Sequence, residues 1–130
     1  MELTRRAVGI VPILMLCGVQ VPQVSAHESE SGPNGGPMVE VKGLHLELIA
    51  KDADLAVVLS DTAHAPLASK GASGRAVVLE GSTQKILPLL PMDPDRLTAK
   101  LDKPLSKGAR VVVSAKLASG QELLARFVVK

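Results

Sequence analysis

The chain has 130 residues, 46% of them apolar and 22% charged, with a formal net charge of +2 at neutral pH. This length and composition indicate one globular domain and exclude collagen-like, coiled-coil and strongly disordered chains. With one phenylalanine and no tyrosine or tryptophan, the chain lacks the aromatic platforms and clustered basic charge typical of nucleic-acid-binding proteins.

Residues 1–26 have the pattern of a secretory signal peptide. Two arginines precede an apolar run over residues 7–19, and the segment ends in the small-residue cleavage site Val24-Ser25-Ala26. The run is shorter than the roughly 20 residues that a membrane-spanning helix needs. We therefore expect export to the periplasm, with no stable membrane span after processing.

The only cysteine, Cys17, lies within this segment. A cysteine just after an apolar run suggests a lipid-attachment site, but the bulky Leu16 before it fits that cleavage pocket poorly. Cleavage after Ala26 removes the thiol, so the mature chain has no disulfide and no cysteine metal ligand.

The mature chain is predicted to begin with a flexible arm of glycine, proline and serine over residues 27–37, followed by a β-domain over residues 38–130. From Met38 onward, apolar residues recur with period two between turn residues, which is typical of half-buried strands. The expected strands number about seven and cover residues 44–50, 55–59, 75–80, 83–89, 97–101, 110–117 and 123–129. Seven short strands with no helical period predict an all-β, antiparallel, immunoglobulin-like sandwich.

Three local features refine this prediction. Gly81-Ser82 predicts a two-residue hairpin turn with glycine first. Pro88 places the strand over residues 83–89 at an edge or near its end, and residues 90–95 are expected not to continue a ladder. In the last strand Phe127 belongs to the inward-facing set with Leu123 and Ala125.

Catalytic motifs are absent: the sequence has no nucleophile elbow, zinc-protease helix, phosphate loop or dinucleotide turn. Asp93 and Asp95 flank Pro94 and suggest a cation chelate, but two carboxylates fall short of the oxygens that calcium takes. A solvated turn is the simpler interpretation. We therefore predict a protein that is not an enzyme.

The three histidines are the candidate metal ligands. His27 becomes the first mature residue, where its amine and ring nitrogen together chelate copper(II). His45 lies on the outward face of its strand beside Glu47, and His64 follows Asp61 in a loop. Each also has a simpler interpretation as a solvated polar residue. Met38 and Met92 are thioether candidates for copper(I) that core packing explains as well.

Three stretches carry a resemblance to a known family: Gly32-Pro33-Asn34-Gly35-Gly36-Pro37-Met38-Val39-Glu40-Val41, His45-Leu46-Glu47-Leu48, and a valine-rich strand over residues 55–61 that ends in Asp61. Together with the closing Arg126-Phe127, they resemble small secreted bacterial proteins and a module near the N-terminus of periplasmic adaptor (membrane fusion) proteins of heavy-metal efflux pumps. Such modules often carry a histidine just before the Gly-Gly pair, a place that Pro33 and Asn34 occupy here. A mature chain that begins with histidine is also similar to periplasmic copper-resistance carriers.

The resemblance implies a periplasmic accessory protein of copper or zinc efflux or homeostasis, with an efflux adaptor or another envelope protein as partner. In that hypothesis His27, with His45 or His64, forms a labile copper(II) or zinc site. The alternative is a non-metal envelope interaction module that adds an edge strand to a partner, suggested by the Pro88-bearing strand and the glycine-rich arm.

Overall fold

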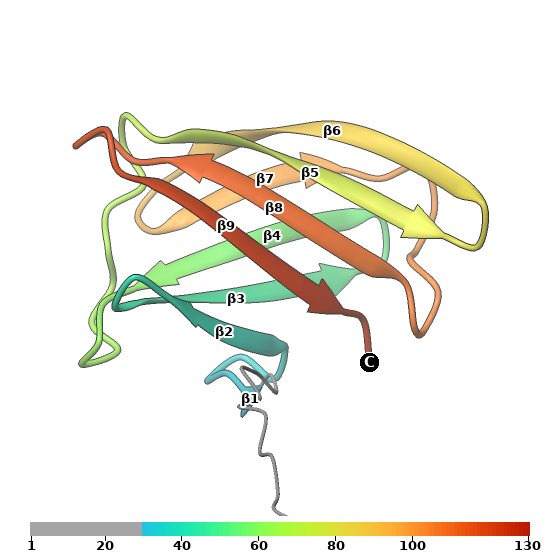
Figure 1. Ribbon diagram of the computed structural model, residues 1–130, viewed down its shortest axis with the longest axis horizontal. Coiled ribbons are helices and arrows are strands. Elements are labelled where there is room, and N and C mark those ends of the chain that lie inside the picture. Colours follow the sequence, from blue (N-terminus) through green and yellow to red (C-terminus); the bar gives the residue numbers. More distant parts are fainter. Residues whose placement is uncertain (1–29) are drawn as a thin grey trace, which may run out of the picture.

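The computed structural model describes residues 30–130, which form nine strands and no helix (Figure 1). The strands are β1 (Glu30–Ser31), β2 (Pro37–Val41), β3 (Leu44–Lys51), β4 (Asp54–Ser60), β5 (Ser73–Glu80), β6 (Thr83–Met92), β7 (Arg96–Lys100), β8 (Arg110–Lys116) and β9 (Glu122–Val128). Every paired neighbour is antiparallel. The predicted all-β, antiparallel class is thus confirmed.

The strand count differs from the expected seven because β1 and β2 precede the first predicted strand. The seven predicted strands correspond to β3 through β9. The C-terminal hairpin follows its period-two pattern closely: Leu123, Ala125 and Phe127 are buried, whereas the residues between them are exposed. Alternation in this segment therefore predicted both the strand and the face that it buries.

Two-residue turns set the register of the hairpins. Glu80 pairs with Thr83 across Gly81-Ser82, and Gly81 has a φ of 60°. A positive φ at the first turn position is the property that a type II′ turn requires and glycine supplies. This confirms the predicted hairpin. The β2–β3 turn uses Lys42 and Gly43, with φ of 53° and 82°.

The strands form one sheet in the order β1-β2-β3-β4-β7-β6-β5-β8-β9. β6 joins its two halves: residues 83–89 pair with β5 and residues 90–92 pair with β7. The expectation that residues 90–95 cannot continue a ladder is therefore wrong as far as Met92. Each half of β6 is hydrogen-bonded to a neighbouring strand on one side only. Proline has no N–H to donate, and a strand with one unpaired side accommodates Pro88 and Pro91 without losing a ladder hydrogen bond.

The sheet curls so that its two halves share one core. Buried side chains from β3 and β4, such as Leu46 and Val57, belong to the same cluster as Val111 and Val113 of β8 and Phe127 of β9. β2 lies close to β9, at the opposite end of the strand order. Lys42 Nζ, in the turn after β2, donates a hydrogen bond of 2.9 Å to the Glu122 carbonyl oxygen. The curling thus brings distant parts of the strand order together.

Candidate functional site

The structure brings together two of the three candidate histidines. His45 is the second residue of β3, and His64 lies in the loop that follows β4. Their imidazole rings are stacked, with centroids 4.4 Å apart and planes inclined by 17°. His45 and His64 are 19 positions apart in the sequence, and the fold brings their rings into contact. His27 lies outside the described residues.

Asp61 organises this histidine pair. Its backbone oxygen contacts His45 Nδ1 at 3.0 Å and accepts a hydrogen bond of 2.9 Å from the His64 backbone N–H. Its carboxylate oxygen Oδ1 accepts two more, each of 2.9 Å, from the backbone N–H groups of Ala63 and Ala65. A carbonyl oxygen only accepts, so the contact assigns the proton of the neutral His45 ring to Nδ1 and leaves Nε2 as its ligand atom.

The stacked geometry limits how the pair can bind a metal ion. An ion bonded to an imidazole nitrogen lies near the plane of that ring, and two nearly parallel stacked rings do not share such a position. His64 is exposed, so a turn of its side chain would let both rings reach one ion. Within residues 30–130 no group of three or more histidine, cysteine, aspartate or glutamate side chains is placed to hold a metal ion.

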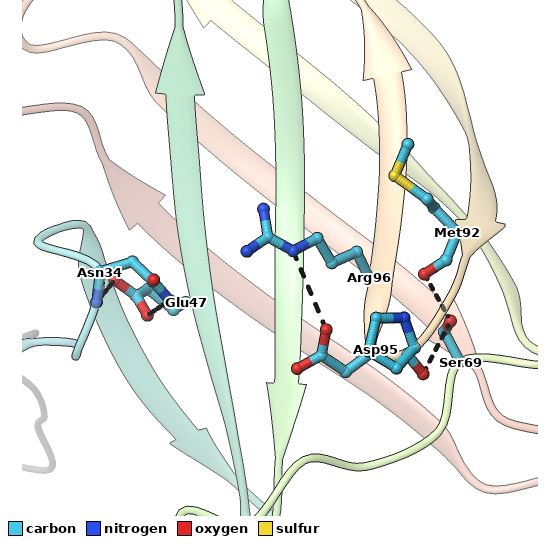
Figure 2. Close-up of polar contacts among 7 residues, drawn as sticks. Asn34, Glu47, Ser69, Met92, Asp95 and Arg96 are labelled. Atoms are coloured by element: carbon cyan, nitrogen blue, oxygen red, sulfur yellow. Dashed lines mark hydrogen bonds and ion pairs between the residues drawn. The ribbon is translucent and has the colours of Figure 1, made fainter.

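The structure buries the carboxylate of Glu47, which was expected on an outward face beside His45. Glu47 is 2% exposed. Its oxygens accept hydrogen bonds from Asn34 N (2.9 Å), Asn34 Nδ2 (3.0 Å) and Gly36 N (2.9 Å), as Figure 2 shows for Asn34 and Glu47. With both oxygens occupied, the carboxylate binds two backbone N–H groups and the Asn34 side-chain amide, and the expected His45–Glu47 ligand pair is not formed.

Residues 30–36, which we call the strap, lie against this carboxylate. β1 pairs with the start of β2, and Gly32 N donates a hydrogen bond of 2.8 Å to the Gly36 oxygen. A Cβ at Gly32 would lie 2.3 Å from the Glu47 carboxyl carbon. The described part of the predicted flexible arm is thus fastened to β3, and glycine allows the close approach. The sequence signal that could have indicated this contact is a glutamate within an apolar strand together with a nearby run of turn residues, whose N–H groups need acceptors.

Asp93 and Asp95, for which the sequence favoured a solvated turn over a cation chelate, lie at the turn between β6 and β7. Asp95 contacts the neighbouring Arg96 at 3.8 Å. The buried Ser69 hydroxyl donates to the Met92 oxygen at 3.0 Å, which fixes this turn to the segment before β5 (Figure 2). Met38 is buried on β2 and Met92 is exposed on β6. These strands are not neighbours in the sheet, so the two thioethers do not form a pair of adjacent ligands.

Two exposed carboxylates hold the loop between β7 and β8. Ser106 N donates a hydrogen bond of 2.8 Å to Glu80, and this bond, with smaller contributions from Lys103 and Lys85, lowers the pKa of Glu80 below its ordinary value. Lys85 forms an ion pair with Asp102, which lowers the pKa of Asp102. Both carboxyl groups are therefore stabilised in their ionised form.

The structure also has an open groove of about 780 Å³, which begins at Val41 and Lys42 at the end of β2. It extends over β5, β8 and the beginning of β9, and Arg75, Lys116 and Leu124 are among its lining residues. Neither His45 nor His64 lines it. The candidate metal ligands are thus not part of this groove.

No family model, no curated protein and no solved structure matches the chain. Residues 30–130 also include no helix with the length and hydropathy that crossing a bilayer requires.

Proposed function

We propose that this chain is a periplasmic accessory protein of copper or zinc efflux or homeostasis, exported by residues 1–26 and acting by binding rather than catalysis. One observation carries the proposal: the fold places His45 and His64, which are 19 positions apart in the sequence, with ring centroids 4.4 Å apart. Imidazole nitrogen is a preferred ligand of both copper and zinc. In this proposal the halves of the curled sheet act as the layers of an immunoglobulin-like sandwich scaffold.

The proposed ligand atoms are His45 Nε2 and a nitrogen of His64 after its ring has turned away from the stack. His27 adds its α-amino group and ring nitrogen if cleavage follows Ala26. The Asp61 carbonyl orients His45 through Nδ1, as the second partner of a metal-bound histidine commonly does. The resemblance to efflux adaptor modules supports the same metals and suggests an adaptor as partner.

Edge-strand addition receives less support from the geometry. β6 lies inside the strand order, but each of its halves has one unpaired side. The strand carries Pro88 and Pro91, and proline is one of the devices by which proteins prevent pairing with another strand. The strap that was expected to act as a flexible tether is fastened to Glu47.

Calorimetric titration of the exported protein with copper(II) and zinc at pH 7.5 tests the proposal. We expect His45→Ala and His64→Ala each to weaken binding at least tenfold, with the same loss for His27→Ala. Lys51→Ala, at the other end of β3, should change affinity less than twofold. Wild-type affinity should fall at least tenfold from pH 7.5 to 5.5, because imidazole must lose its proton to bind.

A double His45→Ala/His64→Ala variant that binds both ions as tightly as wild type would refute the site. The mass of the exported protein independently checks cleavage after Ala26. A pull-down of an efflux adaptor that requires bound metal would support the proposed partner.

A further inference from the structure

The outer face of the β6-β5-β8-β9 half combines arginines with aliphatic side chains. In β5, β8 and β9 the residues between the buried positions point away from the core. Arg75, Arg110 and Arg126 occupy three of these outward positions, one on each strand, and all three are exposed. Figure 1 shows β5, β8 and β9 running side by side.

The strand register fixes the arrangement on this face, which we call the arginine face. Ile86 pairs with Val77, Val77 with Val112, and Val112 with Arg126. Three aliphatic side chains therefore form a row across β6, β5 and β8 that ends at an arginine on β9. Arg75 lies one outward position to one side of this row, and Arg110 lies to the other.

The spacing suits one ligand element. Strands lie about 4.8 Å apart and outward positions about 7 Å apart, so the apolar row spans about 10 Å between its outer Cα atoms, and the Cα atoms of Arg75 and Arg110 are about 14 Å apart. An α-helix with its side chains is about 10–12 Å wide. A helix lying along the row would place its apolar stripe on the valines and each flank beside an arginine.

The charge of the face is unbalanced. Among residues 30–130, the ion pairs involve other basic residues, and none includes Arg75, Arg110 or Arg126. Of the outward positions on these four strands, only Glu122 is acidic, and it pairs in register with Lys116. Arginine binds carboxylates through a planar fork of donors and favours such contacts at interfaces. The complementary partner is therefore an acidic one.

We propose that the arginine face docks an acidic amphipathic helix of a partner protein. Sheet faces with exposed aliphatic side chains are commonly covered by helices, and Ile86 is 59% exposed while Val128 beside Arg110 is 54% exposed. A membrane is less suited, because the aliphatic row has arginines at one end and on both sides instead of forming a separate apolar surface. The chain also has no tryptophan or tyrosine to anchor at a lipid interface. The proposal does not depend on a metal site.

Fluorescence anisotropy with a labelled synthetic helix tests the docking. The probe is an 18-residue helix with a leucine stripe flanked on both sides by glutamate, and its matched controls carry glutamine or lysine in place of every glutamate. We expect the glutamate helix to bind at least tenfold more tightly than the glutamine helix and the lysine helix not to bind. Raising the salt concentration should weaken binding.

Variants of the full chain locate the site. The triple variant Arg75→Gln/Arg110→Gln/Arg126→Gln should weaken binding at least tenfold, and Ile86→Gln at least threefold. A matched triple variant, Lys51→Gln/Lys70→Gln/Lys107→Gln, removes the same charge from exposed lysines elsewhere and should change affinity less than twofold. Far-ultraviolet circular dichroism of each variant checks that its β-structure is intact.

Equal losses in the two triple variants would show non-specific attraction and overturn the proposal. Equal binding of the glutamate and glutamine helices, or no binding of either, would also overturn it. Vesicles of phosphatidylglycerol and single-stranded oligo-dT serve as competing ligands. Tighter binding of either one, lost in the arginine variant, would assign the face to that ligand instead.

Discussion

Replacing Glu47 by alanine should loosen the strap and destabilise the whole domain. The substitution removes an acceptor that receives three hydrogen bonds from Asn34 and Gly36. Hydrogen bonds to a charged acceptor contribute roughly 1.5–3 kcal/mol each and do not add. Part of that loss is offset, because the buried charge is also removed and the freed N–H groups reach water when the strap frays. We expect a loss of about 2–3 kcal/mol in the free energy of unfolding.

Glu47→Gln should cost less, about 1–2 kcal/mol, because it keeps one oxygen but directs an NH₂ group toward N–H donors. Glu40→Gln is the matched control: Glu40 is exposed on β2, and its replacement should change stability by less than about 0.5 kcal/mol. Urea unfolding followed by circular dichroism gives the three values. Amide exchange at Gly36 should become roughly 30-fold faster in the alanine variant for 2 kcal/mol lost.

A loss below about 1 kcal/mol in Glu47→Ala, with exchange at Gly36 unchanged, would refute this reasoning. It would mean that β1 and the close backbone approach hold the strap without the carboxylate. An equal cost for the alanine and glutamine variants would instead show that the charge of the acceptor, rather than its number of oxygens, is what the strap requires.

Three other results follow from the structure. Phe127→Ala should lower the free energy of unfolding by roughly 3–5 kcal/mol because it leaves a cavity, and Phe127→Leu should lower it by less. Urea unfolding measures both values, and a loss under about 1 kcal/mol in the alanine variant would contradict the burial of the ring. Gly36→Ala should destabilise by about 1–3 kcal/mol, because its Cβ would lie 2.0 Å from the Leu48 backbone oxygen; an unchanged melting temperature would contradict that contact. Folding lowers the pKa of Glu80 and of Asp102. The stability that these carboxylates add is therefore present above their unfolded-state pKa values and is lost as the pH falls through their folded-state pKa values. Unfolding curves measured from pH 6 to 3 should show that the Glu80→Gln/Asp102→Asn variant loses less stability on acidification than the wild type does.

The C-terminal hairpin shows how far alternation predicts this fold. Buried residues alternate with exposed ones from Leu123 to Phe127 and with half-buried ones from Val111 to Ala115, since these strands face the core on one side only. β4 departs from this rule: Ala56 and Val58 are buried together with Leu55 and Val57. Both faces of that strand are covered from Leu55 to Leu59, and this stretch is accordingly apolar.

The two segments whose structure was predicted wrongly, β6 and the strap, depend on what they contact elsewhere in the chain and not on their local sequence pattern. Proline disfavours a central strand, but β6 changes its partner from β5 to β7 after Leu89, and neither half has a ladder on both sides. Nothing within residues 83–92 specifies that change. The strap is similar: a run of glycine, proline and asparagine predicts flexibility until a buried carboxylate supplies an acceptor for its N–H groups.

The histidine pair could be predicted only in part for the same reason. Residue types and their places on a strand and in a loop made His45 and His64 candidates, but their contact depends on the direction of the loop after β4. Asp61 sets that direction by accepting hydrogen bonds from three residues of the loop and contacting His45 from the same residue. His64 also adopts a φ of 66°, a conformation that a non-glycine residue keeps only where its surroundings support it. Asp61→Ala keeps the backbone oxygen that contacts His45 and His64 but removes the Oδ1 acceptor of Ala63 and Ala65. Because those two bonds close the loop that carries His64, this is the variant expected to separate the rings without removing either one.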